Sequence, residues 1–174
     1  MNAVKKFAEA VNKVNDTMIY VVAVGIFLTG VVVVYSIFMR FLFSKPPIWS
    51  FDLTSLLSAS TAILAGGWCL KIGGHVRVDI FWEKLSVKNR TLLDMFTSIF
   101  MFSVAVVLVW KGGAQVLRYF DMGSVASSGL NIHLWLKWLI MPIGGILILL
   151  QGIVNFIDDL CVFTTGKKLL AEEV

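Results

Sequence analysis

The hydrophobic positions of this chain gather into four long stretches that contain no charged residue. A helix that crosses the hydrocarbon core of a membrane, which is about 30 Å thick, needs about 20 apolar residues. Uncharged stretches of 23, 18, 16 and 20 residues therefore predict helices that span a membrane. The stretches are bounded by Asp16 and Arg40, by Asp52 and Lys71, by Asp94 and Lys111, and by Lys137 and Asp158.

The third stretch is the shortest, because its 16 residues cover only about 24 Å of helix. We expect its helix to continue past both boundary charges, whose side chains can reach toward the lipid headgroups. The predicted fold class is thus an all-α membrane protein, with a single four-helix domain over residues 1–174. Its approximate spans are residues 17–40, 53–70, 92–114 and 137–157.

A different pattern precedes the first stretch. Apolar residues recur at Val4, Phe7, Ala8, Val11 and Val14, a spacing that predicts a short amphipathic helix on the membrane surface. The uncharged stretch that follows is longer than the core of a secretory signal, which has about 7–15 residues. We therefore expect the first membrane helix to be retained in the mature protein.

The composition supports a membrane location and limits the possible functions. Hydrophobic residues make up 58% of the chain and charged residues only 15%, which is too few for the surface of a water-soluble enzyme. Ten of the 15 lysines and arginines lie in the N-terminal tail, the second loop and the C-terminal tail. This bias predicts a multi-pass membrane protein with both termini in the cytoplasm. The net charge of +4 therefore does not call for a nucleic-acid partner.

Tryptophan positions agree with the predicted spans. An indole ring is apolar, but its N–H group forms a hydrogen bond in the wet headgroup layer, so tryptophan collects at membrane interfaces. All six tryptophans lie at or near a predicted helix end, and we expect them to act as interfacial anchors. They are Trp49, Trp68, Trp82, Trp110, Trp135 and Trp138.

Residues that could carry chemistry are few. The two cysteines, Cys69 and Cys161, do not form a Cys-x-x-Cys pair, and His75 and His133 fall in loops on opposite sides of the membrane. No ionisable residue lies in the middle of a predicted span, where ion and proton pathways place them. The sequence predicts no catalytic residue, cofactor or metal ion, and hence no enzyme.

One stripe of small residues suggests close helix packing. Ser55, Ala59, Ala62 and Gly66 recur on one face of the second predicted helix. Small residues let membrane helices approach closely, and such approach is how they associate without a hydrophobic driving force. The stripe indicates either internal packing of a four-helix bundle or docking to a partner protein, and the sequence leaves both open.

The second loop, which starts at Lys71, contains Gly73 and Gly74, and these glycines are expected to end the second helix. His75, Arg77 and Asp79 follow, alternating with valines. These three residues could form a polar cluster in a cytoplasmic hairpin or contact a partner.

Four motifs together resemble a known family. They are Arg40, the Trp49-Ser50-Phe51-Asp52 segment, the Gly74-His75-Val76-Arg77-Val78-Asp79 segment and the Met141-Pro142-Ile143-Gly144-Gly145 segment. In order and spacing they are similar to the small membrane subunit of tripartite ATP-independent periplasmic (TRAP) transporters, often called the DctQ family. The resemblance extends from Val11 to Phe156 and includes the number of helices.

The resemblance implies a location in the bacterial inner membrane and a non-catalytic role. Such a subunit would brace a large elevator-type membrane subunit and help to dock a periplasmic substrate-binding protein, in sodium-coupled uptake of organic anions such as carboxylates or sugar acids. The expected partners are these two proteins and membrane lipids. By position, Arg40, Trp49 and Asp52 are candidate contacts near the periplasmic surface, with the small-residue stripe as a contact face. The alternative is a self-contained small oligomeric channel or exporter.

Overall fold

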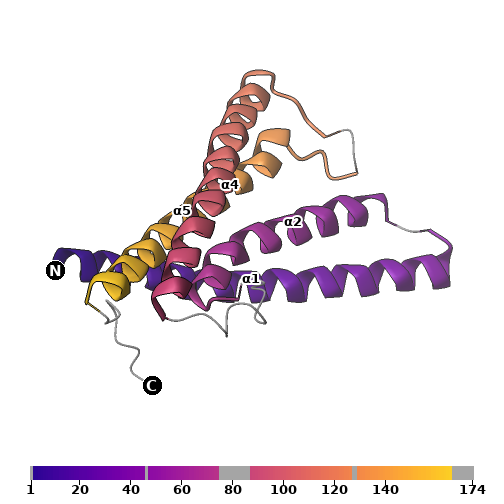
Figure 1. Ribbon diagram of the computed structural model, residues 1–174. Helices are drawn as coiled ribbons and strands as arrows, with labels where there is room; N and C mark the ends of the chain where they lie inside the picture. The colour runs from indigo at the N-terminus through magenta and orange to yellow at the C-terminus, as the bar shows by residue number, and fades with distance from the viewer. Residues whose placement is uncertain (1, 46, 75–86, 127–128, 166–174) are drawn as a thin grey trace.

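The computed structural model describes residues 2–45, 47–74, 87–126 and 129–165. Within these residues the chain is almost entirely helical, and Val125 and His133 form an isolated β-bridge. This arrangement confirms the predicted all-α fold class with four helices. The helices are α1 (Asn2–Phe43), α2 (Ile48–Lys71), α4 (Val87–Asp121) and α5 (Leu134–Thr165) (Figure 1).

Each helix is long enough to cross a membrane. The shortest, α2, has 24 residues, which correspond to about 36 Å of helix. All four contain an 18-residue window that is apolar enough to span a bilayer. Large apolar side chains are exposed along their outer faces, for example Phe27 and Phe41 of α1. Such exposure is expected where lipid, not water, covers the surface.

The amphipathic segment predicted over Val4–Val14 does not form a separate helix. It is the beginning of α1, which runs without a break for 42 residues. Neither proline nor glycine occurs between this segment and the apolar stretch, so nothing in the backbone interrupts the helix. Ala8 and Val11 of the segment are buried in a small cluster with Val154 of α5.

The helices form two antiparallel hairpins, α1 with α2 and α4 with α5. The hairpins are joined where α2 packs on α5, and they diverge from the end that holds the N-terminus (Figure 1). In addition, α1 makes a smaller contact with α5. The order of packing, α1 to α2 to α5 to α4, is therefore open and does not close into a compact bundle.

Helix α5 is the central helix. About a third of its most apolar window is buried inside the protein, compared with 6% for each of the other three helices. Pro142 lies within α5, and Gly112 of α4 leaves room for its ring, since a Cβ atom there would come within 2.9 Å of Pro142 Cδ. The other helices are arranged around α5.

The end of α2 confirms the role predicted for its two glycines. Gly73 has a positive φ of 65°, a conformation that glycine adopts easily. Its N–H group donates to the carbonyl oxygen of Leu70, and the N–H group of Gly74 donates to that of Cys69. These two bonds form a Schellman cap, which satisfies carbonyl groups at the helix end.

Candidate functional site

Glycines bring α5 close to both α2 and α4. A Cβ atom on Gly144 would collide with Ile63 Cγ2 and lie 3.1 Å from the Ile63 carbonyl oxygen. On the other side, a Cβ atom on Gly145 would lie 3.0 Å from Leu108 Cβ. The Gly144-Gly145 pair is thus a point where α5 lies close to both α2 and α4.

Two ion pairs mark the ends of the α2–α5 region. At one end, Lys71 Nζ lies 2.5 and 2.6 Å from the two carboxylate oxygens of Asp16. At the other end, Lys137 Nζ lies 3.7 Å from Asp52 Oδ1. Along α2 the two pairs are separated by about 28 Å, close to the hydrocarbon thickness of about 30 Å. Four of the eight charges that bounded the apolar stretches therefore pair at two levels that match the faces of a bilayer.

A cluster of amide side chains, which we call the amide cluster, joins α1, α2 and α5 next to the Asp16–Lys71 pair. Asn15 Nδ2 donates to Gln151 Oε1 at 2.7 Å, and Asn15 and Gln151 are 0% and 1% exposed. Gln151 Nε2 donates to Asn12 Oδ1 at 3.2 Å and to Asn155 Oδ1 at 3.1 Å. Asn155 Nδ2 donates to the Leu70 carbonyl oxygen at 3.0 Å, near the end of α2. The cluster consists of Asn12, Asn15, Gln151 and Asn155.

Asn15 is held tightly against α2. Its Oδ1 atom is buried and has no hydrogen-bond partner in the structure. A Cβ atom on Gly67 would collide with this oxygen, so only glycine leaves space for Asn15 at this position. A buried oxygen without a hydrogen-bond partner lowers the stability of the fold. The Asn15 oxygen lies directly against Gly67.

The amide cluster was not predicted from the sequence. Only ionisable residues were considered as signs of a functional site within the apolar stretches, and asparagine and glutamine carry no charge. The available signal was helical spacing. Gln151 and Asn155 are four residues apart within or at the edge of an apolar stretch, and Asn12 and Asn15 are three apart. Residues at these spacings share a helix face.

The three residues predicted near the periplasmic surface have different surroundings. Arg40 is exposed in the last turn of α1. Trp49 stacks on Tyr35 of α1, with ring centroids 5.9 Å apart. Asp52 pairs with Lys137 of α5. The structure thus uses Trp49 and Asp52 to connect helices, whereas the Arg40 side chain projects from the surface.

The small-residue stripe of α2 is largely turned outward. Ser55, Ala59 and Ala62 are exposed, whereas Gly66 packs against α5, where a Cβ atom would lie 2.8 Å from Ile148 Cδ1. Packing within this chain therefore accounts for Gly66 and leaves the other three positions available for another helix.

The remaining candidates of the second loop, His75, Arg77, Asp79 and Trp82, lie outside the described residues. Their predicted roles stay predictions.

Besides Trp49, two of the described tryptophans connect helices. Trp135 contacts Phe120 edge to face at 5.8 Å, and Trp138 stacks on Tyr119 at 5.9 Å, so both connect α5 to the end of α4. Trp110 is exposed, with Lys111 Nζ 4.6 Å from its ring centroid. Because α4 continues to Asp121, Trp110 lies about three turns before the end of its helix.

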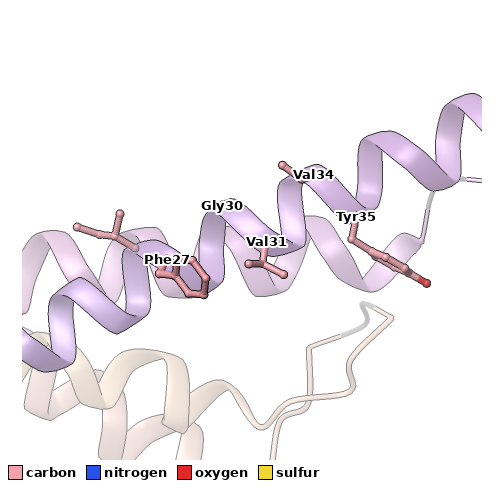
Figure 2. Close-up of a pocket in the computed structure, with 6 residues that line it drawn as sticks. Phe27, Gly30, Val31, Val34 and Tyr35 are labelled. Atoms are coloured by element: carbon pink, nitrogen blue, oxygen red, sulfur yellow. The ribbon is translucent and has the colours of Figure 1, made fainter.

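One depression on the described surface is apolar and shallow. It has a volume of about 530 Å³ and lies along one face of α1, where Gly30 leaves a gap between larger side chains (Figure 2). In the part of the chain that the structure describes, no group of three His, Cys, Asp or Glu side chains could hold a metal ion. The depression is lined by Ile26, Phe27, Gly30, Val31, Val34 and Tyr35.

Comparison with known proteins gives two findings. The sequence profile of a family described as tripartite ATP-independent periplasmic transporters, DctQ component, matches residues 28–162. The chain is also similar to the sialic acid TRAP transporter small permease protein SiaQ of Vibrio cholerae serotype O1. The two sequences are 24% identical over 150 residues, which represent 82% of this chain and 83% of the relative. The profile match includes all of α2 and α4 and most of α5.

Proposed function

Given that this chain belongs to the DctQ component family of the tripartite ATP-independent periplasmic transporters, we propose that it is a non-catalytic scaffold of such a transporter. As a small permease subunit with four membrane helices, it is a multi-pass protein of the inner membrane. In the proposed role it braces a large elevator-type subunit and helps to dock a periplasmic substrate-binding protein. Its termini lie in the cytoplasm in this proposal, because positive charge is concentrated on their side.

The observation that best supports a bracing role is the outward position of Ser55, Ala59 and Ala62. These small side chains lie on α2, whose other contacts are fixed by the Gly144–Ile63 approach and by an ion pair at each end. A stripe that permits close helix approach is therefore presented by a well-supported helix.

We propose that the complete transporter takes up organic anions, either carboxylates or sugar acids, with sodium. The name of the Vibrio cholerae relative gives sialic acid as the substrate of its transporter. Sialic acid carries a carboxylate on a sugar ring and is the first substrate to test.

Reconstitution in liposomes tests this function. Vesicles that contain only this chain are expected to take up no more labelled sialic acid than empty vesicles. Uptake is expected once the large subunit, the binding protein and an inward sodium gradient are added. The physical reason is that the described ion pairs lie at the ends of α2, and not along a path through the membrane. Solute flux through this chain in the absence of both partners would instead support the small oligomeric channel.

Enlarging the stripe is expected to weaken assembly. The Ala59→Leu/Ala62→Leu variant should reduce co-purification of the large subunit about tenfold, because branched side chains keep the partner helix away from α2. Both positions are exposed, so the variant should retain the thermal stability of the isolated chain. The measurement is the ratio of large to small subunit after affinity purification.

Ala114→Leu is the matched control, because Ala114 is an exposed alanine on α4. It should leave co-purification unchanged. Equal assembly by wild type and the Ala59→Leu/Ala62→Leu variant would rule out this face as the contact, without affecting the family assignment.

A further inference from the structure

A narrow apolar notch lies between the beginning of α1 and the second half of α5. Its volume is about 130 Å³. Four of the side chains around it come from α1 and two from α5, and all but one are apolar. A cavity with such walls is better filled by hydrocarbon than by water, which needs several polar partners. The lining residues are Ala10, Val11, Val14, Asn15, Leu147 and Leu150.

The notch adjoins an apolar surface of α1 that α5 does not cover. Ala8 and Val11 are buried against α5, whereas Phe7 and Val14 are 40% and 44% exposed. The apolar face of this amphipathic segment is thus divided between a protein contact and an open side. A helix of this kind places its open apolar side in the boundary layer of a membrane.

Lysines border the open side. Lys6 is four residues before Ala10 and Lys13 is three residues after it, so both are surface neighbours of this notch residue. Both lysines are exposed. From Val4 to Val14 the helix carries Lys5, Lys6 and Lys13 against Glu9, a net charge of +2.

The residues around the notch lie at different depths along the membrane normal. Asn15, which closes one end, neighbours Asp16, whose pair with Lys71 marks one edge of the apolar layer. Leu147 packs toward Gly67 of α2, inside that edge. Along α1, Lys13 flanks the notch between Val11 and Val14, and Lys6 lies beyond Ala10, at the end of the notch farthest from the apolar layer. An apolar slot with positive charge along its flank and at its outer end has the same order of polarity as a phospholipid.

We propose that this notch is a binding site for an anionic phospholipid of the surrounding leaflet. A segment of an acyl chain lies between α1 and α5 against Val14, Leu147 and Leu150. The headgroup phosphate lies beside Lys6 and Lys13. The site belongs to this chain alone and does not depend on its role in transport.

The test is competitive lipid retention, measured by native mass spectrometry of the full chain purified in mild detergent. The probes are palmitoyl-oleoyl phosphatidylglycerol and palmitoyl-oleoyl phosphatidylcholine in equal amounts. Wild type is expected to retain phosphatidylglycerol at least tenfold better. The Lys6→Gln/Lys13→Gln variant should bring this ratio close to one, because basic residues near the surface supply the attraction to anionic lipid. Val14→Trp, at an exposed position, should fill the notch and reduce retention of both lipids.

Lys45→Gln/Lys111→Gln is the control with the same change in charge. Both lysines are exposed and lie away from the notch, Lys45 on the α1–α2 connection and Lys111 on α4. It should retain the wild-type ratio. The proposal is overturned if wild type shows no preference, or if the control and the Lys6→Gln/Lys13→Gln variant lose it equally. It is also overturned if a photo-crosslinker at Ala10 in the assembled transporter captures the large subunit and not phospholipid.

Discussion

Replacing Gly144 by leucine is expected to lower the free energy of unfolding of this chain by about 3 kcal/mol. The Cβ atom of any larger residue would collide with Ile63 Cγ2 and lie 3.1 Å from the Ile63 carbonyl oxygen, so the backbones of α2 and α5 must separate. Separation at this point also strains the Asp52–Lys137 pair, which joins the same two helices. The measurement is unfolding in detergent micelles, followed by tryptophan fluorescence.

Gly113 of α4 provides the matched control. A Cβ atom there would meet nothing within 4 Å. Gly113→Leu should therefore be neutral or slightly stabilising, because leucine favours a helix more than glycine does. A loss of stability as large in Gly113→Leu as in Gly144→Leu would mean that the close α2–α5 approach is not the cause.

The second large effect is expected from the amide cluster. Gln151→Leu keeps a similar side-chain size but removes the closer of the two acceptors of Asn15 Nδ2, the other being the Val11 carbonyl oxygen, and it removes the donor to Asn12 and Asn155. Leaving a buried polar group unsatisfied costs about 1–3 kcal/mol. We expect a loss of about 2 kcal/mol in the free energy of unfolding. Unfolding curves in the same micelles provide the measurement.

Two further variants test the cause. Gln115→Leu makes the same change at a partly exposed position of α4 and should have little effect. Asn15→Leu/Gln151→Leu removes both members of the 2.7 Å hydrogen bond. Its loss in the free energy of unfolding should therefore be smaller than the sum of the losses in Asn15→Leu and in Gln151→Leu. Additive losses would show that Asn15 and Gln151 do not act together.

The sequence was sufficient for the features that depend on a single helix. Apolar stretches of 16 to 23 residues predicted the four helices, because membrane thickness sets a minimum length that few other structures need. The cap at Gly73 was predicted because a positive φ strongly favours glycine. Four of the eight boundary charges of the stretches also proved to be the members of the two ion pairs at the ends of α2.

Features that depend on several helices could not be predicted in the same way. Whether Ala59 faces inward or outward depends on which side of α2 meets α5, and a stripe of small residues suits both arrangements. The partnership of Asn15 with Gln151 joins residues 136 positions apart, and a single sequence gives no information about that pairing. The continuity of α1 was missed because amphipathic and fully apolar patterns suggested two environments, although one helix can pass through both.

The two ion pairs of α2 have a consequence for the membrane in which this protein functions. Each pair joins α2 to a different neighbour, so the spacing of about 28 Å between them is fixed by helix geometry and not by flexible loops. In a thicker bilayer the lipid next to α2 must thin, and in a thinner bilayer the protein must tilt, each at a modest cost for each ångström of mismatch. The chain should therefore be most stable in lipids whose hydrocarbon thickness matches that spacing. The acyl-chain length of the surrounding lipid is thus expected to change the stability of the folded protein.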